Sequence, residues 1–258
     1  MTRTALSIAG SDSGGGAGIQ ADLKAFARCG VHGTTAITAI TAQNTVGVTS
    51  VHQIPPQVII DQVRAVVDDI GVDAVKVGML GSAETAEAVL EALGLLSAPV
   101  VVDPVMVAES GAVLLDADAR QVLRDRILPL ASVVTPNVPE ACVLIGADPD
   151  SPPPPEDLAR RVHELGPGAV VVTGGHGEEG IDIYFDGGEP IGIPGERHPD
   201  GAAHGSGCTH SSALAAHLAL GATPLEAARQ ARVIASEAVR DGLRDIGAGP
   251  GPVNALGT

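Results

Sequence analysis

A glycine-rich turn followed by small and apolar residues is the strongest candidate for chemistry in this sequence. Residues 204–208 read His-Gly-Ser-Gly-Cys, and the apolar run that follows predicts a helix over about 208–220. Gly205 and Gly207 would leave backbone N–H groups exposed at the helix N-terminus, where the helix dipole stabilises an anion. The same dipole should lower the pKa of Cys208 below the free-thiol value of about 8.5, so that the thiol could act as a base or nucleophile. The competing interpretation is that Cys208 is only a small buried apolar residue.

Two carboxylates follow predicted strands. Asp103 ends the run Val-Val-Val-Asp, and Glu140 ends the run Thr-Pro-Asn-Val-Pro-Glu that follows the next strand. Because the carboxyl ends of parallel strands meet at one edge of a sheet, both side chains should face the same crevice. A pair of carboxylates suits Mg²⁺, which also bridges substrate phosphates. Taken singly, Asp103 would be a helix-capping residue and Glu140 a first-turn helix residue.

Three other segments follow predicted strands, and each could line that crevice. Residues 10–18 contain several glycines before a helix, but they match neither the P-loop nor the G-x-G-x-x-G pattern, so a tight turn is an equally good interpretation. Gln43 and Asn44 follow a threonine-rich strand, and Lys76 begins the run Lys-Val-Gly-Met. Those two segments could instead be loop or core residues.

Strands and helices must alternate to position these residues. The predicted strands are 4–9, 31–41, 74–77, 99–103, 132–135 and 169–172, and the predicted helices are 17–29, 55–70, 82–95, 116–127, 156–165, 208–220 and one opening at Thr223. Such alternation favours a mostly parallel sheet with helices on both faces. Residues 182–185 and 190–193 suggest a hairpin, and residues 152–155, all proline, a stiff loop within one domain over residues 1–258.

The composition excludes several classes of function. The 258 residues carry a net charge of −16, and only two of the 15 basic residues are lysines, so the chain should repel nucleic acids and anionic membranes. Aromatic residues are 1% of the chain, which predicts a core of alanine, valine, leucine and isoleucine. Three widely spaced cysteines and the lack of a long apolar N-terminal stretch favour a reduced, cytoplasmic setting.

Six segments together resemble one known family. The segments are residues 9–22 (AGSDSGGGAGIQAD), 41–45 (TAQNT), 76–80 (KVGML), 103–106 (DPVM), 135–140 (TPNVPE) and 204–209 (HGSGCT). In this order they are similar to the bacterial hydroxymethylpyrimidine/phosphomethylpyrimidine kinases of thiamine biosynthesis, which belong to the ribokinase-like superfamily. The resemblance spans nearly the whole chain.

The resemblance implies a three-layer α/β/α sandwich, a homodimer, and the use of ATP with Mg²⁺ to phosphorylate 4-amino-5-hydroxymethyl-2-methylpyrimidine and then its monophosphate. It also implies roles for individual residues. Gly205, Ser206 and Gly207 form an anion hole for the transferred phosphoryl group, Cys208 is the base, Asp103 and Glu140 act around Mg²⁺, Gly10, Ala17, Asp22, Gln43, Met79 and Val105 line the pyrimidine pocket, and Asn137, Thr173 and Gly175 bind the nucleotide. Asp22 and Gln43 are the residues expected to hydrogen-bond the ring.

Two positions depart from the family pattern. Thr173 stands where the family often has a lysine before Gly-Gly-His, and Glu109 stands where it often has a lysine before Ser-Gly. Both changes remove a positive charge from the nucleotide side, which bears most on the second phosphorylation. Two alternatives therefore stay open. One is a pyridoxal or pyridoxine kinase, and the other is a weakened member of the fold that binds a pyrimidine as a sensor.

Overall fold

Short strands rich in valine form the centre of the structure. In the computed structural model, which describes residues 1–106, 114–174, 180–198 and 201–257, the inner strands β4, β5 and β7 are buried along their whole length. This burial is typical of parallel strands covered on both faces. The nine strands of the described residues form one sheet in the order β3-β2-β1-β4-β5-β6-β7-β8-β9.

The six central strands, β2, β1, β4, β5, β6 and β7 in sheet order, are mutually parallel, whereas β3 at one edge and β8 and β9 at the other pair antiparallel. The strands are β1 (Thr4–Asp12), β2 (His32–Asn44), β3 (Gly47–Gln53), β4 (Ala74–Val77), β5 (Val100–Val102), β6 (Val133–Val134), β7 (Val170–Val172), β8 (Asp182–Phe185) and β9 (Ile191–Ile193). The predicted mostly parallel sheet is therefore confirmed, and so is the hairpin, which forms β8 and β9.

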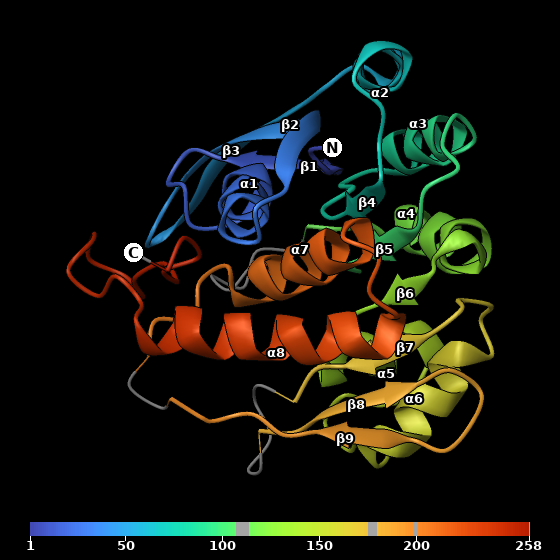
Figure 1. Ribbon diagram of the computed structural model, residues 1–258, viewed down its shortest axis with the longest axis vertical. Coiled ribbons are helices and arrows are strands. Elements are labelled where there is room, and N and C mark those ends of the chain that lie inside the picture. Colours follow the sequence, from blue (N-terminus) through green and yellow to red (C-terminus); the bar gives the residue numbers. More distant parts are fainter. Residues whose placement is uncertain (107–113, 175–179, 199–200, 258) are drawn as a thin grey trace.

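Helices cover both faces of this sheet (Figure 1). They are α1 (Gly18–Arg28), α2 (Pro56–Asp69), α3 (Ala83–Leu93), α4 (Ala117–Val122), α5 (Val138–Ile145), α6 (Pro155–His163), α7 (Ser206–Ala219) and α8 (Pro224–Arg240). A π-helical turn, Leu123–Ile127, and a 3-10 turn, Leu128–Leu130, continue α4. Apolar residues of α2 to α6 share one core layer with the sheet, and those of α1, α7 and α8 share the other. The α/β/α sandwich is thus present as predicted.

Alanines allow the two C-terminal helices to approach closely. α7 and α8 lie side by side across the sheet (Figure 1), and both contribute fully buried alanines to the core layer between them. The expectation of a core without many rings is confirmed, because aliphatic residues and alanine make up nearly all of both layers. No helix in the described part of the chain is long and apolar enough to cross a bilayer.

Two elements were absent from the sequence prediction. β3 is largely exposed and polar, so it lacks the alternation that marks a half-buried strand. α5 is only eight residues long and contains a proline in its first turn. This helix received no predicted range from the sequence and was implied only by one interpretation of Glu140. β1, β4, β5, β6 and β7 nevertheless bring their carboxyl ends to one edge of the sheet, as the crevice rule requires.

Candidate active site

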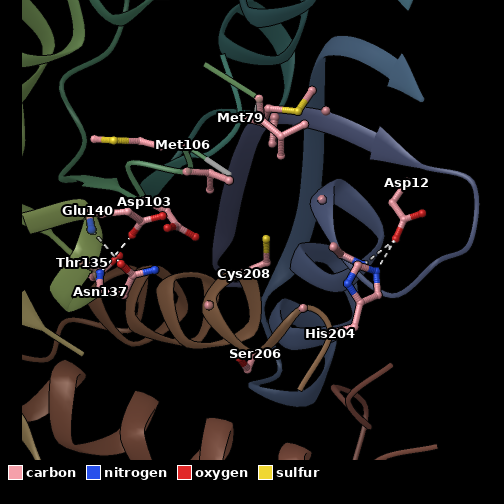
Figure 2. A pocket seen from close by; sticks show the side chains of 18 of the residues that line it. Asp12, Met79, Asp103, Met106, Thr135, Asn137, Glu140, His204, Ser206 and Cys208 are labelled. Carbon is pink, nitrogen blue, oxygen red and sulfur yellow. Dashed lines mark hydrogen bonds and ion pairs between the residues drawn. The ribbon is translucent and has the colours of Figure 1, made fainter. Parts of the chain in front are cut away.

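A cavity of about 580 Å³ lies at this edge of the sheet (Figure 2). Its volume is in the range of small-molecule sites. Thirteen of the residues assigned to the site from the sequence line it: Gly10, Ala17, Gln43, Met79, Val105, Asp103, Glu140, Asn137, Thr173, Gly205, Ser206, Gly207 and Cys208. Asp22 does not line it, and Gly175 and Glu109 lie outside the described residues. The structure therefore brings together side chains that are up to about 200 positions apart in the sequence.

The N-terminus of α7 forms one wall of the cavity. The helix starts at Ser206, and the preceding Gly205 has φ +87°, a left-handed conformation that favours glycine. A Cβ on Gly205 would lie 1.8 Å from the backbone oxygen of Gly16. The glycine loop, residues 13–18, therefore touches the turn before α7 backbone to backbone. The first N–H groups of a helix have no acceptor within the helix. The turn at residues 205–208 thus points donors and a positive dipole end toward the cavity.

The Cys208 thiol is half-buried at the centre of the cavity wall (Figure 2). Burial raises the pKa of this thiol to about 12; Lys76 opposes the shift, whereas the charges of Asp22 and Asp103 add to it. The sequence-based expectation of a lowered pKa was therefore wrong for the protein without ligands. It considered the dipole of α7 alone, and the two carboxylates come from α1 and from the end of β5.

At the wall of the cavity, Lys76 forms a completely buried ion pair with Asp22. Lys76 Nζ lies 2.8 Å from Asp22 Oδ1, and both side chains have no exposed surface. Ser7 Oγ and Ser212 Oγ also donate to the Asp22 carboxylate, at 2.5 and 2.7 Å. Burial disfavours the charged form of Lys76, but Asp22, followed by Cys208 and Asp103, raises the pKa of this lysine.

This arrangement revises the role assigned to Asp22. Its carboxylate is occupied by Lys76, Ser7 and Ser212, so we no longer expect it to hydrogen-bond the pyrimidine ring directly. Lys76, which was assigned no role from the sequence, is the side chain that connects Asp22 to the cavity lining. The two positions are 54 residues apart, and no local pattern marks them as partners.

Asp103 and Glu140 lie on the opposite side of the cavity from His204 (Figure 2). Asp103 Oδ2 accepts a hydrogen bond from Ser211 Oγ at 2.9 Å. Glu140 and Asn137 form a capping box at the start of α5, so the first-turn interpretation of Glu140 is also correct. Burial, and then the charge of Asp103, raises the pKa of Glu140 to about 8. Burial also raises the pKa of Asp103, despite the nearby Lys76.

Burial disfavours the ionisation of both carboxylates, and the charge of Asp103 adds to this effect on Glu140. Such a pair suits a divalent cation. No group of three or more His, Cys, Asp or Glu side chains that could hold a metal occurs among the described residues. Mg²⁺ does not need such a group, because it binds through one or two carboxylates and keeps water and phosphate oxygens as its other ligands. Asp103 and Glu140 therefore fit Mg²⁺.

The side of the cavity that the sequence assigned to the nucleotide lies where β6 and β7 end. Asn137 and Thr173 line it, and the Thr173 N–H donates to Pro136 O at 2.9 Å. The next residue, Gly174, donates its N–H to Asp182 Oδ1 at 2.8 Å. A buried carboxylate of β8 thus fixes the backbone that follows Thr173.

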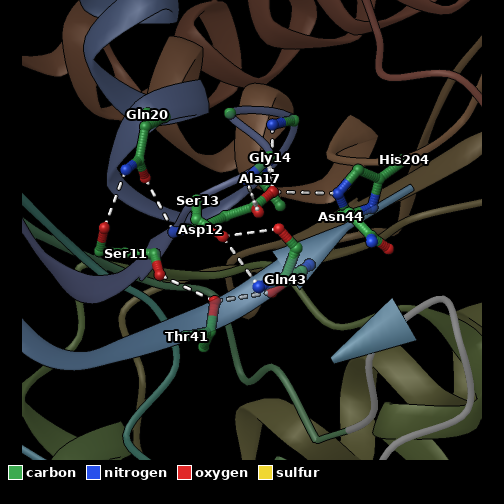
Figure 3. Close-up of polar contacts among 12 residues, drawn as sticks. Ser11, Asp12, Ser13, Gly14, Ala17, Gln20, Thr41, Gln43, Asn44 and His204 are labelled. Atoms are coloured by element: carbon green, nitrogen blue, oxygen red, sulfur yellow. Dashed lines mark hydrogen bonds and ion pairs between the residues drawn. The ribbon is translucent and has the colours of Figure 1, made fainter. Parts of the chain in front are cut away.

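The opposite side of the cavity is formed by the glycine loop and β2. A Cβ on Gly10 would lie 2.6 Å from Met79 Cε, so the methionine packs against bare backbone. Gln43 is fixed through its backbone, since Ser13 Oγ donates to Gln43 O at 2.6 Å and the Gln43 N–H donates to Ser13 Oγ at 2.8 Å. Its side-chain oxygen accepts from Thr41 Oγ1 at 3.1 Å, which leaves the amide N–H₂ group to face a ligand (Figure 3).

Sequence reasoning missed Asp12 and His204 as site residues. Both line the cavity, and their side chains are hydrogen-bonded, with His204 Nε2 3.1 Å from Asp12 Oδ2 (Figure 3). One local signal was available, because an aspartate before several glycines often accepts their backbone N–H groups in an Asx turn. The partner histidine, 192 positions away, had no such signal.

Comparisons with known proteins agree with this geometry. The family model described as phosphomethylpyrimidine kinase matches residues 12–254. A hydroxymethylpyrimidine/phosphomethylpyrimidine kinase of Synechococcus elongatus is 47% identical over 252 residues, which are 96% of this chain and 95% of that protein. A bifunctional thiamine biosynthesis protein of Geobacter sulfurreducens is 46% identical over 97% of this chain, which spans about half (52%) of the length of that protein.

A solved structure with the same fold is the pyridoxal kinase of Staphylococcus aureus in complex with ADP. It has a TM-score of 0.89 and 32% sequence identity, and it covers 100% of this chain and 94% of its own. The family match over almost the entire length confirms the resemblance inferred from the six segments, and the chain belongs to the phosphomethylpyrimidine kinase family.

Proposed function

We propose that this protein is a kinase that uses ATP to phosphorylate 4-amino-5-hydroxymethyl-2-methylpyrimidine and then its monophosphate, in thiamine biosynthesis. The family match and the named relatives support the reaction. One observation in the structure carries the proposal. The N-terminal turn of α7, with Cys208, and the Asp103–Glu140 pair line the same cavity, together with Gln43 and Met79.

Phosphoryl transfer requires positioning and charge stabilisation more than covalent chemistry from the protein. The acceptor oxygen forms a bond to the γ-phosphorus, the bond to the β-phosphate oxygen breaks, and ADP leaves. The N–H groups of Gly207 and Cys208 at the start of α7 would hold the oxygens of the transferred group. When bound by Asp103 and Glu140, Mg²⁺ would supply positive charge to the phosphates.

Cys208 would take the proton of the substrate hydroxyl. In the protein without ligands its thiol is protonated, because burial and two carboxylates raise its pKa to about 12. Neutralising the charge of Asp103 would remove one of these carboxylates and leave Lys76 as the nearest positive charge. The thiol would then ionise more readily as the acceptor oxygen loses its proton. Thus the base would become active only in the loaded site.

The direct test is incubation of the purified protein with ATP, Mg²⁺ and the pyrimidine alcohol, followed by mass spectrometry of the mono- and diphosphate. We expect both products, with the diphosphate appearing later. Omission of Mg²⁺ should abolish both. Binding of the alcohol without consumption of ATP would instead support the sensor interpretation, and no binding at all would refute the proposal.

A second experiment tests the base. Cys208→Ala should lower turnover roughly 10²-fold, which is the typical contribution of a general base. Cys29→Ala is the matched control, because Cys29 lies at the end of α1 and does not line the cavity. Turnover of Cys208→Ala close to that of the unaltered protein would mean that another group or water accepts the proton.

A pyridoxal kinase is the second candidate function. The S. aureus pyridoxal kinase covers the full length of this chain, and pyridoxal is also a ring that carries a hydroxymethyl group. The higher identity to relatives named as pyrimidine kinases favours the first candidate. Turnover of the two alcohols measured side by side distinguishes them, and we expect a higher kcat/KM for the pyrimidine.

We also propose that the chain is a single cytoplasmic domain that forms a homodimer. Large apolar side chains of β2, β3 and α2 are exposed, namely Ile40, Val51 and Val58. An exposed apolar edge of this kind is often covered by a second copy. Light scattering of the untagged protein should give about twice the mass of the 25.8 kDa chain.

A further inference from the structure

The carboxylate of Asp12, at the end of β1, connects two loops of the cavity. It is 3% exposed and accepts the N–H of Gly14 at 2.7 Å, those of Gly16 and Ala17 at 3.0 and 2.9 Å, and Nε2 of His204 at 3.1 Å (Figure 3). The first three donors belong to the glycine loop, and the fourth precedes the N-terminal turn of α7. One side chain therefore holds both loops.

The two loops also touch directly. Gly205 follows His204, and the position of its Cα leaves no room for a side chain against Gly16 O, 1.8 Å from an added Cβ. The backbone oxygen of His204 accepts from the Val253 N–H at 3.0 Å, so the C-terminal segment supports the same loop. The glycine contact sets how closely the loops approach, and the Asp12–His204 pair fixes their relative position.

In the Asp12–His204 pair, the carboxyl group of Asp12 is ionised near neutral pH. Burial alone would raise the pKa of Asp12, but hydrogen bonds from His204, Ala17 and Gly14 hold it below its usual value. A buried carboxylate with several donors is a rigid anchor, because each of its acceptor positions is used. Removing its charge would loosen both loops at once.

We propose that Asp12 is a positioning residue for phosphoryl transfer, which acts through His204 to align the acceptor side of the cavity with the N-terminal turn of α7. The inference rests on the proposed kinase function. Transfer requires the acceptor oxygen and the phosphorus to be about 3 Å apart and in line, and a misplacement of about 1 Å can lower the rate about 10²-fold. Asp12 should therefore affect kcat more than the binding of either substrate.

The kinetic test uses Asp12→Asn, which keeps the size of the side chain but loses its charge. We expect kcat to fall about 10- to 100-fold for the alcohol and for the monophosphate, with both KM values within about threefold. Asp73→Asn is the matched control, since Asp73 also accepts a backbone N–H, that of Thr4 at 2.9 Å, but lies outside the cavity. A rise confined to the KM of the pyrimidine would make Asp12 a direct ligand and overturn the inference.

A double-mutant cycle tests the path through His204. His204→Leu should lower kcat as Asp12→Asn does, and the double variant should lose little more than the worse single variant. His204→Gln can still donate an N–H to Asp12, so it should retain more activity than His204→Leu. Additive losses in the cycle would show that the two residues act separately.

Hydrogen exchange measures the coupling without reference to activity. Asp12→Asn should increase amide exchange in residues 203–208 as well as in residues 13–18, and Asp73→Asn should change neither. Increased exchange confined to 13–18 would overturn the inference. If the unaltered protein made no phosphorylated pyrimidine, the proposed function would fail, and this exchange experiment would still decide whether Asp12 couples the loops.

Discussion

At the scale of single residues, the chemistry of Cys208 depends on charges from several elements. Lys76 comes from β4, Asp22 from α1, and Asp103 follows β5. The two carboxylates and burial outweigh the lysine, so the thiol is protonated near neutral pH. For the base proposed above, a protonated resting thiol is an advantage, because a permanent thiolate would be open to oxidation.

Alkylation of Cys208 should therefore be slow at neutral pH. With a pKa of about 12, roughly one thiol in 10⁴ is ionised at pH 8, and the rate should still rise about tenfold per pH unit between pH 8 and pH 10. Iodoacetamide labelling of the ligand-free protein, followed by peptide mass spectrometry, measures it. Cys29, whose pKa burial raises to about 11, provides an internal comparison. A labelling rate of Cys208 that levels off below pH 9 would contradict the charge arrangement described above.

At the scale of elements, the start of α7 depends on glycine for two separate reasons. Gly205 has φ +87°, and its Cα lies against the backbone of Gly16. Gly221, after the other end of α7, has a similar φ of +91° but open space around it. Alanine substitutions at Gly205 and Gly221 therefore separate the cost of the left-handed backbone conformation from the cost of the contact with Gly16.

Gly221→Ala should destabilise the protein by about 1–2 kcal/mol, the cost of a left-handed conformation for alanine. Gly205→Ala should cost more, because the added methyl group also displaces the glycine loop, and it should reduce turnover. Urea unfolding of both variants checks the difference. Equal losses of stability would mean that the contact between the two loops contributes nothing.

A second connection between elements involves Asp182 on β8. Its carboxylate accepts from the Gly174 N–H. Oδ2 lies 3.4 Å from Nε2 of His210 on α7, and Oδ1 lies 3.8 Å from Nε of Arg232 on α8. Burial would raise the pKa of Asp182, but His210, Arg232 and Gly174 together lower it. An acid with a lowered pKa stabilises the fold above its unfolded pKa, near 3.8, and this stability is lost as the pH falls further.

Asp182→Asn should therefore destabilise the protein at pH 7 by about 3 kcal/mol, since it leaves the buried guanidinium of Arg232 without its anionic partner. The difference from the unaltered protein should shrink below about pH 4, where Asp182 itself becomes protonated. Urea unfolding at several pH values measures this trend. Asp186→Asn is the control, because Asp186 directly follows β8 and is exposed. A difference that does not change with pH would argue against an ionic role.

At the scale of the whole molecule, a net charge of −16 opposes the approach of anionic substrates. Lys76 lines the cavity but is paired with Asp22, and Lys24 donates to Gly15 O outside the lining. Under the proposed function, phosphates in the described part of the cavity would therefore meet backbone N–H groups, the dipole of α7 and any metal held by Asp103 and Glu140. The long-range field is unfavourable even though the local site is favourable.

Salt should therefore help this enzyme bind its anionic substrates. Raising KCl from about 0.02 M to about 0.2 M screens the field, so the KM values for ATP and for the monophosphate should fall about two- to fivefold. The neutral pyrimidine alcohol is the built-in control, and its KM should stay constant. A KM for ATP that rises with salt would mean that local cations outweigh the net charge.

The sequence by itself determined the features that depend on near neighbours. The alternation of apolar runs predicted the parallel sheet. The predicted helix starts at Ser82 and Thr223 were correct because each residue caps its helix, and a cap involves residues three positions apart. The glycine turn before α7 and the positions of Asp103 and Glu140 after successive strands were predicted for the same reason. The residues that the family resemblance assigned to the site make up half of the cavity lining.

Only the tertiary structure decided which charges meet. Asp22 pairs with Lys76 across 54 positions, and Asp12 pairs with His204 across 192. These contacts raise the pKa of Lys76 and hold that of Asp12 low, and the Asp22–Lys76 pair also acts on Cys208. Periodicity and spacing report the neighbours of a residue along the chain, whereas an ionisation state depends on burial and on every charge within a few ångströms.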